Sequence, residues 1–148
     1  MKHKALPIAV FIVSAGMAIG AEKAVKMADL PDSVRHAVEN ETKGATVRGL
    51  SKETEGGKVF YEAETMMNGR HRDLLFNDSG TLAEVEQETS LDSIPPAARD
   101  AIEKYAAGGK VLKVEAVTRD NTTNYEAEIR KGVKKSEVKV SADGKVLK

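Results

Sequence analysis

Hydrophobic positions recur every three or four residues in two stretches of the chain. They are Val34, Ala37 and Val38 in the first stretch, and Ala98, Ala101, Ile102 and Tyr105 in the second. This i, i+3, i+4 spacing puts the apolar side chains on one stripe of a helix, which can pack against a sheet. The sequence therefore predicts two amphipathic helices.

Each stretch is preceded by a capping residue and a proline and is followed by a glycine. These residues are Asp29, Pro31 and Gly44 in the first case, and Ser93, Pro95 and Gly108 in the second. Asp and Ser are favoured N-caps, and proline is tolerated in the first helical turn. A glycine is typical of the left-handed residue that ends a helix. We expect both helices to lie between these signals.

Beyond each glycine the hydrophobic period changes to two. In the segments 61–64 and 125–128 the sequence Tyr-Glu-Ala-Glu alternates, so the glutamates share one face of a strand and the tyrosine and alanine share the other. Further strands are predicted at 72–76 and 136–140, followed by turns that end in Gly80 and Gly144. Short closing strands are predicted at 81–85 and 145–148.

The two halves repeat each other at a fixed offset. The tetrapeptide at 61–64 recurs letter for letter at 125–128, and the same shift of 64 residues relates Pro31 to Pro95 and Gly80 to Gly144. Such self-similarity indicates duplicated structural units. We therefore predict an α+β fold of two tandem repeats, 29–86 and 93–148. Each would be one helix followed by an antiparallel meander of three or four strands, with the two units packed together across the short segment 87–92.

The N-terminus predicts a signal peptide over residues 1–20. A basic start (Lys2 and Lys4) precedes the uncharged run Ala5–Ile19, and small residues follow it near Gly20. The run is shorter than the roughly 20 residues of a membrane span, although an uncleaved anchor is the alternative. We expect export to the bacterial periplasm or the cell exterior, without stable membrane insertion after cleavage.

The composition narrows the classes of function. The chain has 23 basic and 23 acidic residues, and removing Lys2 and Lys4 with the signal peptide leaves 21 against 23, a net charge near −2. A nucleic-acid-binding protein would show a strongly basic face, so nucleic acid is not expected as a partner. There is no cysteine, which excludes disulfides and a lipid anchor on an N-terminal cysteine.

The pattern resembles the PepSY and PepSY-like domains, exported bacterial modules. The residues that carry the resemblance are Leu30-Pro31, Val34, Ala37, Val38, Gly44, the segment 61–64 and Asn77–Gly80, with Ile94-Pro95, 125–128 and Asp143–Val146 in the second half. The tandem arrangement is similar in particular to the beta-lactamase-inhibitor-like PepSY-like proteins. The resemblance implies a non-catalytic extracytoplasmic domain that in some members is linked to the inhibition or regulation of peptidases.

No residue pattern in the sequence indicates catalysis, a cofactor or a metal site. Outside the predicted signal peptide the histidines are His36 and His71, and neither recurs in the other half. A hydrolytic triad would need a serine activated by a histidine, and no nucleophile-elbow motif is present. His71 and Asp73 share a strand face, but a zinc site needs three or four ligands. We expect that the protein is not an enzyme.

The candidate interaction residues are Glu62, Glu64, Glu126 and Glu128. They are predicted to lie in corresponding places on the sheet face that the helices leave open. A solvated strand face is the simplest interpretation, whereas a negative patch that binds a partner and a cation site are the others. We predict a binding module that inhibits or regulates another envelope or secreted protein, such as a peptidase. The alternative is an envelope module that senses or binds a small ligand or a cation.

Overall fold

The computed structural model describes residues 22–148. The elements are β1 (Lys23–Ala24), η1 (Met27–Asp29), α1 (Asp32–Glu41), β2 (Thr46–Glu55), β3 (Lys58–Met67), β4 (Arg70–Asn77), β5 (Leu82–Thr89), η2 (Leu91–Ser93), α2 (Pro96–Ala106), β6 (Lys110–Arg119), β7 (Thr122–Lys131), β8 (Lys134–Ser141) and β9 (Val146–Leu147). The predicted signal peptide, residues 1–20, lies outside the described residues. Within the described range, no helix has the length and apolar character that crossing a bilayer requires.

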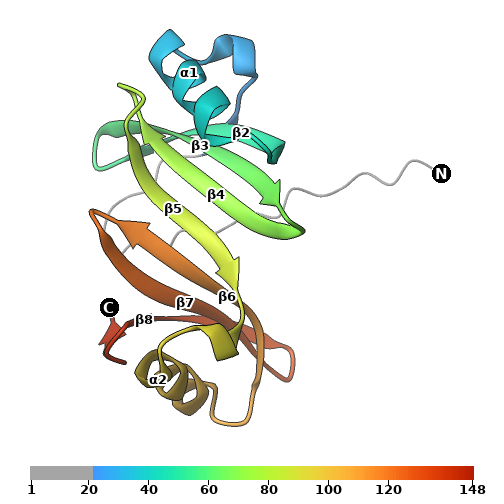
Figure 1. The fold of residues 1–148 in the computed structure, drawn as a ribbon. Helices are drawn as coiled ribbons and strands as arrows, with labels where there is room; N and C mark the ends of the chain where they lie inside the picture. Colours follow the sequence, from blue (N-terminus) through green and yellow to red (C-terminus); the bar gives the residue numbers. More distant parts are fainter. Residues whose placement is uncertain (1–21) are drawn as a thin grey trace, which may run out of the picture.

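The strands form one antiparallel sheet in which each strand pairs with its neighbours in the sequence, from β1 to β9 (Figure 1). The prediction of two tandem repeats, each a helix with its own meander, was therefore wrong, because the chain builds a single nine-stranded sheet. The halves are joined by the pairing of β5 with β6, which runs from Glu84 opposite Arg119 to Thr89 opposite Val114.

The physical reason lies in the segment that was expected to be a linker. Residues 82–89 contain neither glycine nor proline, so the alternating strand continues to Thr89 instead of ending at Val85. A shorter β5 would leave a row of unpaired N–H and C=O groups along an open sheet edge. Continuation of β5 pairs these groups with β6 and merges both meanders into one sheet.

The 64-residue offset also relates the pairing of the strands. Glu62 pairs with Leu75 on β4 as Glu126 pairs with Lys139 on β8. The β2–β3 and β6–β7 pairs each carry an irregularity at the same place, after Val47 and after Val111. Residues 64 apart therefore occupy corresponding positions in the two halves of the sheet.

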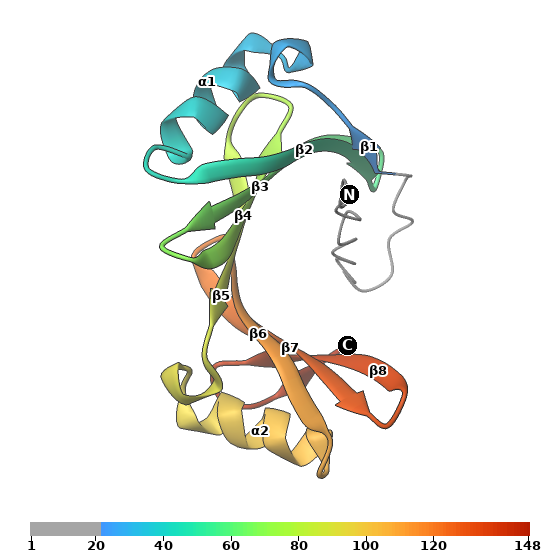
Figure 2. The same ribbon diagram turned by 90° about the vertical axis from the view of Figure 1, so that its right-hand side faces the viewer.

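The sheet curves into an arc, and both helices lie on its convex side (Figures 1 and 2). Under α1 the core contains Val34, Val38, Leu74 and Phe76, all buried. Under α2 it contains Ala98, Ile102, Ala127, Ile129 and Val140. The concave face of the arc is covered by neither helix.

Both helices begin later than the capping signals predict. Asp29 and Ser93 lie at the ends of the short η1 and η2 turns, and the residues that precede α1 and α2 are Pro31 and Pro95. The carbonyl of Pro31 accepts the first helical hydrogen bond, from the N–H of Arg35 at 2.8 Å. Pro31 and Pro95 therefore precede the helices, whereas Pro96 is the first residue of α2.

Each helix start packs against the turn before the last strand of its half. Gly80, at φ +84°, lies so close to α1 that a Cβ atom there would be 2.6 Å from the carbonyl oxygen of Ser33. Gly144, at φ +83°, would place a Cβ atom 2.5 Å from the carbonyl oxygen of Ala97 on α2. Glycine is required at both turns for its positive φ and for this close approach.

Candidate functional site

The concave face is built from the strand residues that alternate with the core residues. Its members include Ser51, Glu53 and Glu55 on β2; Glu62 and Glu64 on β3; His71, Asp73 and Leu75 on β4; Glu84, Glu86 and Glu88 on β5; Lys113, Glu115, Val117 and Arg119 on β6; Asn124, Glu126, Glu128 and Arg130 on β7; and Lys135, Glu137 and Lys139 on β8. Carboxylates outnumber ammonium and guanidinium groups on this face. The curvature of the sheet brings them toward one another.

The four glutamates predicted from the sequence all lie on this face, but they are less exposed than a solvated strand face would be. Glu62 is only 5% exposed. The side chains of Glu126 and Glu128 are 14% and 34% exposed. The strands β4, β5 and β6 separate Glu62 and Glu64 from Glu126 and Glu128, so the structure does not gather the four into one cluster.

A closer group of carboxylates, which the sequence analysis did not identify, lies at the centre of the concave face. Asp73, Glu86 and Glu115 come from the adjacent strands β4, β5 and β6, and each offers a carboxylate oxygen within 4.8 Å of the others. All three are buried. The signal that could have found them is the β5–β6 pairing, which was missed because 87–92 was interpreted as a linker.

Burial and mutual repulsion keep protons on several of these groups. Burial, aided by the charges of Glu115 and Glu84, raises the pKa of Glu86 to about 9. Burial next to Asp73 raises the pKa of Glu62 to about 8. The pKa of Asp73 is raised by burial to about 6, although a hydrogen bond from the Thr65 N–H opposes the change. The face therefore holds protons at neutral pH.

A few cations neutralise part of the concave face. Lys113 forms an ion pair with Glu115. Arg119 Nε lies 2.8 Å from Glu84 Oε2, and its Nη2 lies 3.9 Å from Glu55 Oε2. Burial alone would lower the pKa of Lys113, but the hydrogen bond and charge of Glu115 raise it. The cations of the face are thus held by its own carboxylates.

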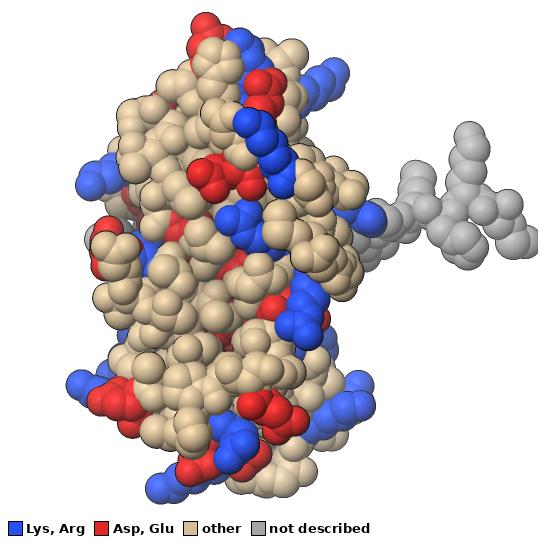
Figure 3. Space-filling view, viewed as in Figure 1, with Lys and Arg blue, Asp and Glu red and all other residues tan. Residues whose placement is uncertain are grey.

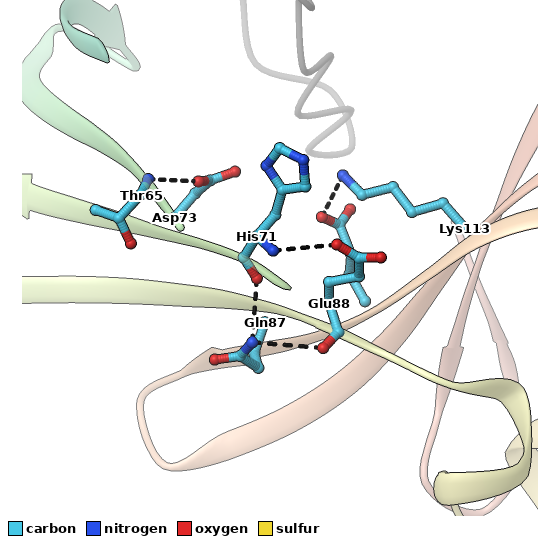
Figure 4. A network of polar contacts seen from close by, with 7 residues as sticks. Thr65, His71, Asp73, Gln87, Glu88 and Lys113 are labelled. Carbon is cyan, nitrogen blue, oxygen red and sulfur yellow. Dashed lines mark hydrogen bonds and ion pairs between the residues drawn. The ribbon is translucent and has the colours of Figure 1, made fainter. Parts of the chain in front are cut away.

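Backbone contacts fix the centre of the face (Figure 4). The N–H of Thr65 donates a hydrogen bond to Asp73 Oδ1 at 3.1 Å. The N–H of His71 donates to Glu88 Oε2, and Gln87 Nε2 donates to the carbonyl oxygen of His71, both at 3.1 Å. These bonds tie β4 to β3 and β5, so the carboxylates stand on a rigid support.

The convex side shows no comparable concentration of one charge among the described residues. On the convex side, which Figure 3 views, acidic and basic side chains are interspersed. Two surface hollows of about 560 and 360 Å³ lie near the end of α2 and near β1. The first is lined by residues 107–110 and 130–132, and the second includes Lys52 and Tyr61. Neither hollow is lined by the central carboxylates.

Comparison with known proteins agrees with this architecture. A model of the family "Putative beta-lactamase-inhibitor-like, PepSY-like" matches residues 59–148. The chain belongs to this family. Among curated proteins, no sequence matches the PepSY-like chain.

Solved structures of Bacteroides proteins share the PepSY-like fold. A "putative periplasmic" protein from Bacteroides eggerthii has a TM-score of 0.67 at 22% identity, over 80% of this chain and 86% of that one. A DUF2874 family protein from Bacteroides uniformis gives 0.65 at 20% identity, with the same coverage. A "BLIP-like" protein from Bacteroides fragilis gives 0.60 at 24% identity, over 80% and 84% of the two chains.

Proposed function

We propose that this PepSY-like protein is an exported, non-catalytic binding module that holds a partner protein against its concave face and inhibits or regulates that partner. Residues 1–20 would direct export as a signal peptide, and the periplasm would be the site of action. The name of the Bacteroides fragilis relative, "BLIP-like", supports an inhibitor-like role. A peptidase is one class of partner that fits.

The observation that carries this proposal is the concave face itself. It extends across β2 to β8, is covered by neither helix, and carries more carboxylates than cations. A concave surface of one charge sign steers a partner of the opposite sign toward it. The partner would therefore present a basic surface to this face.

Affinity capture from a native envelope extract tests the proposal. The bait protein is compared with a double variant, Glu64→Lys and Glu128→Lys, which reverses charge on the concave face. The matched control carries Glu39→Lys and Glu103→Lys, at exposed positions of α1 and α2 that are likewise 64 residues apart. The same partner should bind the parent protein and the control but not the concave-face variant. Equal capture by all three would contradict the proposal.

The alternative function, a module that binds a small ligand or a cation, makes a different prediction. The close approach of Asp73, Glu86 and Glu115 is the feature that would serve it, since calcium prefers oxygen ligands. A ligand that binds only the folded state must raise the melting temperature. A partner-binding role predicts little change in millimolar calcium chloride, whereas a rise of several degrees would favour the alternative.

A further inference from the structure

The second half of the concave face supplies cations to its own carboxylates. Lys139 Nζ, on β8, lies 2.5 Å from Glu126 Oε1 on β7. Lys113, on β6, pairs with Glu115 on the same strand. Both carboxylates are largely buried, and a buried charge is tolerated when an opposite charge pairs with it.

The corresponding positions of the first half contain no cation. Sixty-four residues before Lys139 stands Leu75, which pairs with Glu62 across β3 and β4 as Lys139 pairs with Glu126. Sixty-four residues before Lys113 stands Gly49. Glu62 is 5% exposed, yet its side chain makes no hydrogen bond or ion pair with any residue in the range 22–148.

A second polar group beside Glu62 also lacks a partner. Ser51 lies directly opposite Glu62 on β2 and is 6% exposed. Its Oγ atom is buried and has no hydrogen-bond partner among the described residues. A buried hydroxyl without a partner costs free energy. Because this group is neutral, it is evidence for a missing polar partner that is independent of the acidic charge.

The charged groups that contribute most to the raised pKa of Glu62 are acidic. They are Asp73, Glu22, Glu64 and Glu53. Glu84, next to Leu75 on β5, is already paired with Arg119. Burial and these neighbours raise the pKa of Glu62 to about 8, so its carboxyl group is protonated and neutral at pH 7. An entering cation would displace that proton.

We propose that Ser51 and Glu62 form a site for the ammonium or guanidinium group of a lysine or arginine from the partner protein, in the place that Lys139 fills in the second half. The proposal rests on the proposed function and adds the chemistry of the contact. The partner's side chain donates hydrogen bonds to the Glu62 carboxylate and to Ser51 Oγ. Charge-assisted hydrogen bonds of this kind are the stronger class.

The first experiment fills the site from within the chain. Leu75→Lys places an ammonium group where Lys139 stands in the other half, and Leu75→Met is its uncharged control. The probe is an acetylated, amidated trilysine peptide at low salt and pH 7.5, followed by amide chemical shifts. In the parent protein and in Leu75→Met the peptide should shift the amides around Ser51 and Glu62. Leu75→Lys should bind it at least about tenfold more weakly. Equal binding by Leu75→Lys overturns the proposal.

Glu62→Gln is a second variant that tests the same site if Leu75→Lys does not fold. It should weaken peptide binding at least about tenfold, whereas Glu64→Gln on the same strand should have a smaller effect. Calorimetry in two buffers of different ionisation enthalpy should detect proton release on binding by the parent protein, and none by Glu62→Gln. Chemical shifts centred on Asp73, Glu86 and Glu115, or proton release that is unchanged in Glu62→Gln, would overturn the assignment.

Envelope capture separates this proposal from the proposed function. If the concave face binds a partner and the site is assigned correctly, Leu75→Lys loses the partner that Leu75→Met retains. If Leu75→Lys retains a partner that the Glu64→Lys and Glu128→Lys variant loses, the proposed function stands and the Ser51–Glu62 site is wrong. If the parent protein captures no partner that depends on the concave face, both the proposed function and the Ser51–Glu62 site are wrong.

Discussion

Glu62 and Glu126 occupy corresponding places on the concave face, yet their surroundings differ. Glu126 has Lys139 at 2.5 Å on the next strand, whereas Glu62 has Leu75 in that position. Across the other neighbouring strand, Glu126 faces Glu115, which is paired with Lys113, whereas Glu62 faces Ser51 without a hydrogen-bond partner. The two halves therefore share a backbone plan and differ in how they neutralise a buried carboxylate.

This difference indicates which of the two carboxylates is open to a cation from outside the chain. Taking a carboxylate out of water costs several kcal/mol unless a proton or a cation neutralises it. Lys139 neutralises Glu126 from within the chain, so Glu126 does not need a cation from outside. Glu62 is neutralised by a proton, which a cation from solution or from a partner can replace. The first half of the concave face thus contains the buried glutamate that no cation of the chain neutralises.

On the convex side, corresponding side chains of the two halves differ in size, but both are apolar and buried. Phe76 and Val140 are corresponding core positions, and both are fully buried. Gly80 and Gly144 make the same close approach to a helix carbonyl. These core positions and turns are alike in the two halves, whereas the residues beside Glu62 and Glu126 on the concave face differ.

The largest expected effect compares the two cores. Phe76→Ala should lower the free energy of unfolding by about 3–5 kcal/mol, and Val140→Ala by about 2 kcal/mol. Urea denaturation followed by circular dichroism measures both, with the fully exposed Val133→Ala as a control that should change little. Because β5 and β6 join the halves, each variant should still unfold in one transition. Two separate transitions would show that the halves are independent.

The next effect is the pH dependence of stability. Glu62 and Glu86 have pKa values of about 8 and 9 in the fold, above their value of about 4.5 in the unfolded chain. The folded state therefore holds protons that the unfolded state releases. Their stabilising contribution is complete below pH 4.5 and is lost as the pH rises through 8 and 9. Each group can contribute up to about 1.4 kcal/mol per pH unit.

Between pH 5 and 8 we expect the free energy of unfolding to fall by several kcal/mol, at most about 4 kcal/mol from each of the two groups. Thermal or urea unfolding across this range measures the slope. Glu62→Gln should flatten the slope, whereas Glu39→Gln on the exposed surface of α1 should leave it unchanged. Stability that increases from pH 5 to pH 8 would mean that these carboxylates are not held protonated.

Much of the fold was predictable from the sequence because its signals are local. The helical stripe around Val34 and Val38 and the turns at Gly80 and Gly144 each depend on residues within a few positions of one another. The alternation in 61–64 correctly separated the core face from the polar face. Glycines 44 and 108 have positive φ just beyond the helices, as expected.

The joint between the halves and the central carboxylates could not be predicted in the same way. Whether the strand 82–89 pairs with 110–119 depends on a contact between segments that each look complete alone. Once that pairing was missed, Asp73, Glu86 and Glu115 could not be placed together. Nor does alternation predict that the sheet is curved, or that Glu62 on its concave face is only 5% exposed.

A smaller effect tests the feature that the halves share. Gly80→Ala and Gly144→Ala each force an alanine to adopt a positive φ and bring a Cβ atom within 2.6 Å or less of a helix carbonyl oxygen. Each should destabilise the fold by about 2 kcal/mol, to a similar extent in both halves. Gly69→Ala, which has a positive φ but an open surrounding, is the matched control and should cost less. A clear inequality between Gly80 and Gly144 would show that the helices are held differently.

The smallest effect converts the second half into a copy of the first. Lys139→Met removes the cation beside Glu126 and leaves an apolar side chain, as Leu75 does beside Glu62. Because Lys139 is 30% exposed, water can replace part of the lost contact, and the expected cost is about 1 kcal/mol at pH 8. Lys135→Met, which breaks the more exposed pair with Glu128, is the control and should cost less. If Lys139→Met costs no more than Lys135→Met, Lys139 does not stabilise the fold by neutralising Glu126, and the contrast between the two halves would lose its electrostatic basis.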